Sequence, residues 1–250
     1  MVLPSAILLP LYLYPSVTTD PWKPLYDSLT THPNTQFDIV INPDSGPLLV
    51  GPSDSALSDY VVAVSKLRTY PNVNIFGYVH TGWGAASLQP ALLSNISRYA
   101  TWNTYTPANI SLDGIFIDEA PNAYDPTIYT NLQTATNLAR SSELPKIILN
   151  PGTVADAEYF ALADYIIMFE GAYANFNASE MAALSQAVRA NSSVILYDST
   201  LAEADQNTLV NQLVDLGLGS LDVTTTNTYD TWSELWTAFT QQVSSAVGVK

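Results

Sequence analysis

Two adjacent carboxylates, Asp118 and Glu119, close the apolar run Ile115-Phe116-Ile117, with no basic residue nearby to neutralise them. A second apolar run ends in another acid, Glu170. Glycoside hydrolysis needs one carboxylic acid to protonate the leaving oxygen. It also needs a second carboxylate that stabilises or attacks the sugar cation, or activates water. These residues are therefore candidates for chemistry carried out by paired carboxylates.

The elements that must position these acids follow a regular order. Short apolar runs alternate with longer amphipathic segments, without a break in composition. Strands that are buried on both faces and joined through helices form parallel sheets, so we expect an α/β fold in which residues 1–250 form a single (β/α)8 TIM barrel. An open doubly wound sheet usually has a glycine-rich first turn, whereas the first run here ends in Tyr-Pro. The predicted strands are 6–14, 37–42, 74–80, 112–118, 146–150, 164–170, 193–198 and 220–225.

Helical spacing of apolar residues fills the segments between these runs, as in Leu57, Val61 and Val64. Two start signals, Asp20-Pro21 and Asp125-Pro126, each place an N-cap acid before a proline at the first helical position. A last helix is predicted over 231–246.

The predicted barrel mouth is anionic and rich in aromatic residues. Active sites of barrel enzymes lie at the C-terminal ends of the strands. Most basic residues fall instead on helices, and Lys146 opens its strand at the opposite face. Tyrosine and tryptophan faces suit stacking on sugar rings, while Asn and Asp can satisfy sugar hydroxyls. The candidates for substrate binding at the mouth are Tyr12, Tyr14, Asn42, Asp44, Tyr78, His80, Trp83, Asn150 and Asp198.

Several of these candidates also have a purely structural interpretation. Asn42 and Asn150 each precede a proline and could simply form turns. His80 is more easily explained as a packed or hydrogen-bonded residue than as a general base. Tyr12 and Tyr14 could be barrel packing rather than sugar platforms.

Strand alternation separates the two adjacent acids. Successive side chains of a strand point to opposite faces, so only one of the pair can point straight into the barrel mouth. Because Ile115 and Ile117 suit the helix-facing side, Asp118 is predicted to point inward and Glu119 to shape the rim. Helix capping is the usual structural role for such an acid, but Asp125 fills it here. Glu170 precedes a glycine and could be a solvated loop charge.

Composition argues against several other functions. With 23 acidic and 8 basic residues, the net charge of −15 disfavours binding to nucleic acid or to an anionic membrane surface. There is no cysteine, and a total of two histidines argues against a zinc site. No lysine is placed at the barrel mouth for a Schiff base, and the loops 199–205 and 226–230 lack the glycines of a phosphate site. We therefore expect no cofactor and no metal, although carboxylates could still bind Mg²⁺ in a lyase.

The same stretches resemble the spherulin-4-like proteins (spherulation-specific family 4), which include glycoside hydrolase family 135. The matching segments are 8–15 (LLPLYLYP) with Trp22 after it, 41–47 (INPDSGP), 76–84 (FGYVHTGWG), 99–103 (YATWN), 113–121 (DGIFIDEAP) and 169–173 (FEGAY). The resemblance implies a (β/α)8 barrel, because members of the family share that fold. Characterised members are secreted fungal enzymes that cut α-1,4-linked galactosamine/N-acetylgalactosamine polymers such as galactosaminogalactan.

By this resemblance, the functional acids of the family fall on Asp118, Glu119 and Glu170, and Tyr173 of the FEGAY segment joins the binding candidates. We expect a secreted, monomeric, metal-independent and endo-acting glycoside hydrolase whose partner is a polysaccharide. Asp118 would be the nucleophile or cation stabiliser, Glu170 the general acid/base and Glu119 a supporting carboxylate. The alternative is a non-catalytic glycan-binding or developmental cell-wall protein on the same barrel.

Overall fold

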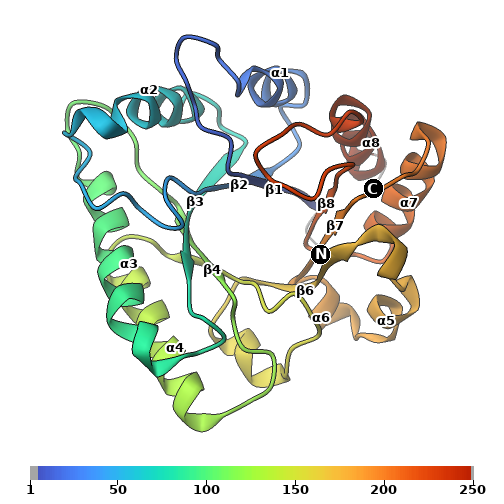
Figure 1. The fold of residues 1–250 in the computed structure, drawn as a ribbon. Coiled ribbons are helices and arrows are strands. Elements are labelled where there is room, and N and C mark those ends of the chain that lie inside the picture. The colour runs from blue at the N-terminus through green and yellow to red at the C-terminus, as the bar shows by residue number, and fades with distance from the viewer. Residues whose placement is uncertain (1–4, 249–250) are drawn as a thin grey trace.

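The computed structural model describes residues 5–248, which form a closed parallel barrel in the order β1 to β8. Figure 1 looks down the barrel, with the strands at the centre and the helices around them. The predicted TIM barrel is therefore confirmed; residues 1–4 and 249–250 of the predicted domain lie outside the described residues. The strands are β1 Ala6–Leu11, β2 Phe37–Ile41, β3 Val73–His80, β4 Gly114–Asp118, β5 Lys146–Leu149, β6 Tyr165–Ala172, β7 Ser192–Tyr197 and β8 Ser220–Val223.

The helical layer is uneven. The β5–β6 connection carries only the 3-10 helix η3 (Ala157–Ala161), while the β6–β7 connection holds the 3-10 helix η4 (Tyr173–Asn175) and two short α-helices. Two further 3-10 helices are η1 (Ser55–Leu57) and η2 (Ala86–Leu88). The α-helices are α1 Lys23–Thr31, α2 Ser58–Leu67, α3 Gln89–Asn103, α4 Pro126–Ser141, α5 Ala178–Ala183, α6 Gln186–Arg189, α7 Glu203–Asp215 and α8 Trp236–Gly248.

Two apolar layers follow from the alternation along the strands. Ile115 and Ile117 of β4 belong to the large core between strands and helices, whereas Phe116 belongs to the small core inside the barrel. The interior core is completed by one or two residues from most other strands, namely Leu8, Val40, Phe76, Tyr78, Ile148, Ile167 and Ile195. The predicted inward direction of the even-numbered β4 residues is thus confirmed.

The two predicted helix starts have different outcomes. Asp125 caps α4 as expected, because its side chain accepts the backbone N–H groups of Thr127 (2.8 Å) and Ile128 (3.0 Å). The prediction for Asp20 was wrong: it lies in a left-handed turn (φ 46°), and α1 begins at Lys23. The buried Trp22 explains why the helix starts later than predicted. Its indole N–H donates to the Leu13 carbonyl (2.8 Å) and holds the chain in a turn.

Two element ends differ from the predictions by three residues or more. β1 stops at Leu11 rather than at residue 14, because the Tyr12 N–H bonds to the Tyr229 carbonyl (2.8 Å) instead of continuing the ladder. The last helix starts at Trp236 rather than at residue 231, because residues 224–235 form a loop held by hydroxyl groups.

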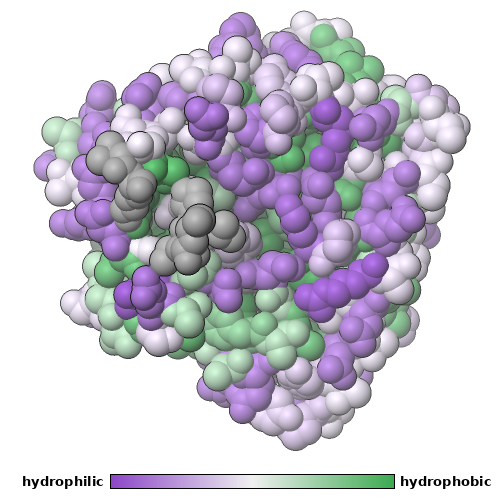
Figure 2. All heavy atoms as spheres, turned by 180° about the vertical axis from the view of Figure 1, so that it is seen from behind, coloured by the Kyte–Doolittle hydropathy of each residue, from purple (hydrophilic) through white to green (hydrophobic). Residues whose placement is uncertain are grey.

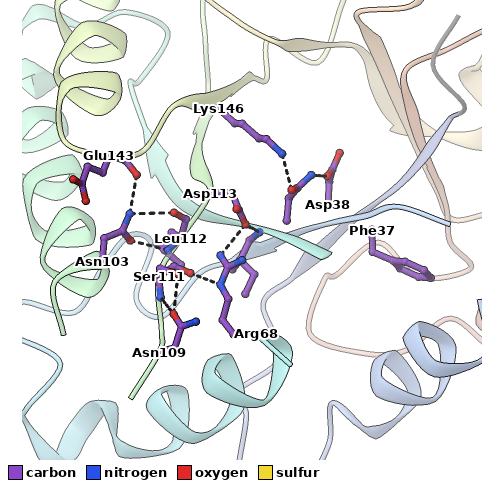
Figure 3. Close-up of polar contacts among 12 residues, drawn as sticks. Phe37, Asp38, Arg68, Asn103, Asn109, Ser111, Leu112, Asp113, Glu143 and Lys146 are labelled. Atoms are coloured by element: carbon purple, nitrogen blue, oxygen red, sulfur yellow. Dashed lines mark hydrogen bonds and ion pairs between the residues drawn. The ribbon is translucent and has the colours of Figure 1, made fainter. Parts of the chain in front are cut away.

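The polar floor of the barrel lies at the amino ends of the strands, where the Lys146 ammonium reaches Asn74 (2.6 Å) and Asn74 donates to the buried Asp38 (2.6 Å). Figure 3 shows this series of hydrogen bonds beside the Arg68–Asp113 ion pair (2.7 Å). Burial raises the pKa of Asp38 to about 6, although Asn74 and Lys146 oppose the rise. Lys146 therefore points into the barrel, at the end opposite to the predicted mouth.

The outer surface is mixed in character. The view from behind shows hydrophilic residues across most of that face with smaller apolar groups between them (Figure 2). Within residues 5–248, no helix is long and apolar enough to cross a membrane.

Gly114 at the start of β4 offers a test of how closely the barrel floor is packed. A Cβ added there would lie 2.0 Å from the Lys146 carbonyl oxygen, whereas one added at Gly51 meets nothing within 4 Å. We expect Gly114→Ala to lower the free energy of unfolding in urea by about 3 kcal/mol or more, because backbone atoms must move. Gly51→Ala is the matched control and should stay within about 0.5 kcal/mol of the wild type. Equal stability of the two variants would contradict the close β4–β5 contact.

Candidate active site

Two acids from non-adjacent strands meet at the carboxyl end of the barrel. Asp118 is the last residue of β4, Glu170 lies in β6, and Asn150 directly follows the strand between them, β5. The Asn150 amide nitrogen donates to Asp118 Oδ1 (2.8 Å) and also to Glu170 Oε2. Asn150 is 5% exposed, so one buried amide fixes the spacing of two carboxylates.

Each acid also receives a tyrosine hydroxyl. Tyr78 of β3 donates to Asp118 Oδ2 (2.8 Å), and Tyr229 of the β8–α8 loop donates to Glu170 Oε1. The Tyr12 ring lies between them and meets both rings edge to face, at centroid distances of 5.5 Å to Tyr78 and 5.3 Å to Tyr229. Such contacts fix ring orientation. Every carboxylate oxygen of the pair thus has a neutral donor, which takes the place of a basic partner.

Burial raises the pKa of both acids, and hydrogen bonds oppose the rise. For Asp118, the Tyr78 hydroxyl, the Glu119 backbone N–H and the Asn150 amide lower the pKa, while the charge of Glu119 raises it. For Glu170, Tyr229 and Asn150 lower the pKa and the charge of Asp118 raises it. Asp118 has the larger number of donors, so it is the better site for a lasting negative charge, and Glu170 is the better site for a proton.

Glu119 lies at the rim, as alternation predicted. Its backbone is left-handed (φ 49°), and its carbonyl accepts the Thr81 hydroxyl (2.6 Å) and the Trp83 N–H (2.7 Å). Its side chain is 42% exposed and faces His80 Nδ1 at 3.5 Å. His80 therefore faces Glu119, and the two form an ion pair when the imidazole is protonated.

Trp83 and Tyr14 are the exposed aromatic residues among the binding candidates. Trp83 is 59% exposed and sits in a run of three left-handed residues with Gly82 and Gly84. Tyr14 is 51% exposed and packs edge to face on Tyr60 (5.7 Å). Both rings are exposed and thus available for stacking.

Four other candidates have partners outside the acid pair. Asn42 accepts the Gly46 N–H (2.8 Å) and so forms a turn, and Asp44 is exposed in the same loop. Asp198 is exposed and accepts Asn227 Nδ2 (3.2 Å), while Tyr173 packs on the outer core. Among the described residues, no hydrogen bond joins these four to Asp118 or Glu170. Their role in substrate binding stays a prediction.

Tyr229 is a site residue that the sequence patterns did not predict. The loop 226–230 lacks the glycines of a phosphate site, but the last loop of a barrel also contributes side chains to the mouth. Its tyrosine, just past a short strand, was the available signal. Hydrogen bonds within the loop and from Trp232 to the Pro21 carbonyl (2.8 Å) hold it beside the β1–α1 loop, where Figure 1 draws it in red.

Metal ligands are not gathered in the described part of the chain: no group of three or more His, Asp and Glu residues there could hold a metal ion.

Comparisons with known proteins point to one family. The sequence profile of spherulation-specific family 4 matches residues 6–243. Spherulin-4 of Physarum polycephalum is 35% identical over 175 residues, which are 69% of this chain and 46% of that protein. The chain thus spans about half the length of this relative.

Two solved structures have the same fold. The crystal structure of Aspergillus clavatus Sph3 in complex with GalNAc has a TM-score of 0.88 and 28% identity, covering 96% of this chain and 98% of that one. A chitinase from Bacteroides thetaiotaomicron has a TM-score of 0.61 and 10% identity, covering 97% and 96%. At that identity, the chitinase supports the fold alone.

The Tyr229 hydroxyl can be tested without any substrate. It donates to Glu170 and thereby lowers the pKa of that carboxyl, so Tyr229→Phe should raise the pKa of Glu170. We expect NMR titration of ¹³C-labelled glutamate carboxyls to show this rise. Tyr70→Phe, on the loop before β3 at the opposite end of the barrel, is the control and should leave the titration unchanged. An unchanged titration in Tyr229→Phe would mean that the hydroxyl does not act on Glu170.

Proposed function

Because this chain belongs to spherulation-specific family 4, as its motifs predicted, we propose that it is a secreted, endo-acting and metal-independent glycoside hydrolase. Its substrate would be an α-1,4-linked polymer of galactosamine and N-acetylgalactosamine. One observation carries the proposal: Asp118 and Glu170 converge on the single amide of Asn150 at the barrel mouth. The structural similarity to Aspergillus clavatus Sph3, which was crystallised with GalNAc, supports the sugar class.

The proposed mechanism divides the work between the two acids. Asp118 accepts hydrogen bonds from Tyr78, Asn150 and the Glu119 backbone, so it remains ionised and attacks or stabilises the sugar cation. Glu170 holds the proton and gives it to the leaving oxygen. Glu119, at the rim beside His80, supports the negative potential without touching the reacting atoms.

The spacing of the pair predicts the stereochemical outcome. Two hydrogen bonds that meet at one nitrogen keep the nearest oxygens of Asp118 and Glu170 within roughly 6 Å. Inverting enzymes need about 6.5–9.5 Å between their carboxyl groups, to leave room for water, and retaining enzymes about 5–5.5 Å. We therefore expect the first product to keep the α configuration, as followed by ¹H NMR of the anomeric protons during digestion. A first product with the β configuration would exclude Asp118 as a nucleophile.

The roles of the acids are tested by isosteric substitution. Asp118→Asn and Glu170→Gln should each lower kcat/KM by roughly 10²–10⁴-fold or more, because each removes one half of the acid–nucleophile pair. The circular dichroism spectrum should be unchanged, and Tm nearly so. Glu119→Gln is the comparison, and its loss should stay within roughly 100-fold, since that side chain lies at the rim. A Glu119 variant as inactive as Asp118→Asn would transfer the central role to Glu119.

Digestion of partly deacetylated α-1,4-galactosaminan tests the function itself. New reducing ends, with oligosaccharides of several lengths seen by mass spectrometry, indicate an endo-acting hydrolase. Retention of the protein on the polymer without cleavage would favour the glycan-binding alternative.

A further inference from the structure

Trp83 combines two features that are unfavourable in themselves. Its side chain is 59% exposed, and its backbone is left-handed (φ 59°), which is unusual for a bulky residue. Gly82 (φ 59°) and Gly84 (φ 81°) on either side are left-handed as well. Such a conformation persists only where surrounding contacts hold the backbone, and it is concentrated at functional sites. The contacts that hold this turn therefore indicate what it does.

One buried hydroxyl group holds the turn. Thr81 is 4% exposed; its Oγ1 accepts the Gly84 N–H (3.0 Å), and its O–H donates to the Glu119 carbonyl (2.6 Å). The Trp83 N–H donates to the same carbonyl oxygen (2.7 Å). The Thr81 N–H donates in turn to the Asp118 carbonyl (3.0 Å). The backbone that carries the Trp83 ring is thus bonded directly to the end of β4, where the acids lie.

Packing on both sides limits movement of the turn. A Cβ added at Gly82 would lie 2.5 Å from Leu88 Cδ1, and one added at Gly84 would lie 2.4 Å from Ile128 Cγ2. Leu88 belongs to η2, and Ile128 to the start of α4. The turn therefore lies against two helical segments as well as against β4.

The indole of Trp83 has no ring partner within residues 5–248. The other exposed aromatic residues, Tyr14 and Tyr124, each pack on a further tyrosine ring, at centroid distances of 5.7 Å and 5.6 Å. The position of the indole is therefore set by its backbone, and so by the hydroxyl that closes the turn.

A fixed indole beside the acids suits a sugar ring. The proposed substrate is a chain of pyranose rings, and their C–H faces can pack on an aromatic face. A side chain that is ordered before the ligand arrives loses little further entropy on binding. Because Trp83 is bonded to Glu119, the residue next to Asp118, a sugar on the indole would lie close to the unit at which the chain is cut.

We propose that Thr81 is a positioning residue: its hydroxyl fixes Trp83 beside the acid pair, and the indole binds a neighbouring sugar unit of the polymer. Stacking away from the reacting bond is equally strong in the ground state and in the transition state. It therefore strengthens binding of the polymer without changing the rate of the chemical step. The inference rests on the proposed function, in which Asp118 and Glu170 cleave the polymer.

Steady-state kinetics on partly deacetylated α-1,4-galactosaminan test the proposal. Thr81→Val keeps the shape but loses the hydroxyl, so KM should rise by roughly 10-fold while kcat stays within about twofold. Trp83→Ala should show the same division between KM and kcat. Thr81→Ser keeps a hydroxyl and should retain the wild-type KM. Val62→Ala, at an exposed apolar position on α2, is the control and should change neither constant.

The outcomes separate the inference from the function on which it rests. An unchanged KM in Thr81→Val or in Trp83→Ala would overturn the inference, and so would a loss of kcat alone. Absence of hydrolysis by the wild type would instead reject the proposed function.

Amide hydrogen exchange tests the positioning role without any substrate. In Thr81→Val, the Trp83 and Gly84 N–H groups should exchange roughly 10-fold faster or more, because the turn opens more often once its hydroxyl is lost. Thr81→Ser should keep the wild-type rates. The Ile166 N–H of β6 should exchange alike in all three proteins, which would show that the barrel is intact. Equal Trp83 and Gly84 rates in Thr81→Val and the wild type would contradict the role of the hydroxyl.

Discussion

The arrangement of the site depends on the two hydrogen bonds donated by the Asn150 amide. They tie the end of β4 to β6 across β5. The other polar atoms of Asn150 are also hydrogen-bonded. Its Oδ1 accepts the Gly152 N–H (3.0 Å), its backbone N–H donates to the Ile117 carbonyl (2.8 Å), and its carbonyl accepts the Ala120 N–H (2.9 Å). A neutral donor suits this position better than a cation would, because it holds both carboxylates without cancelling the charge that a sugar cation must meet. The neutral donors thus explain why these acids need no basic partner.

Lys146 points into the barrel, and an apolar layer keeps its charge away from the acids. Its ammonium is bonded to Asn74 and, through it, to Asp38 at the floor. Side chains such as Phe76, Phe116 and Ile148 fill the space between floor and mouth. Charge is therefore divided along the barrel axis, with a compensated cluster at the amino ends of the strands and an uncompensated one at the carboxyl ends. This division preserves raised carboxyl pKa values at the mouth, where proton transfer benefits from them.

Local periodicity was enough to predict part of the site. The period of two along β4 gave the inward direction of Asp118, and an acid followed by proline gave the Asp125 cap. Contacts between segments far apart in the chain could not be predicted in this way. Tyr229 meets Glu170 across 59 positions, and the Tyr12 N–H leaves its strand for the Tyr229 carbonyl, so neither follows from nearby residues. Asp20 is a further example: the Asp-Pro pair is a good capping signal, but the burial of Trp22 moves the start of α1 to Lys23.

The loops at the mouth carry most of the backbone strain in the described chain. Six non-glycine residues have positive φ: Asp20, Ser45, Trp83, Glu119, Glu143 and Asp198. All except Glu143 lie in loops that follow strands, and each left-handed residue costs of order 1 kcal/mol. The turn at Trp83 and the one at Glu119 hold each other, because the Trp83 N–H donates to the Glu119 carbonyl. An exposed ring and an exposed carboxylate are thereby fixed at the ends of two neighbouring strands, β3 and β4. The acids below are positioned by hydrogen bonds on rigid strands, whereas the rim is positioned by strained turns. The two levels are still coupled, because the backbone N–H and the charge of Glu119 at the rim both act on the pKa of Asp118.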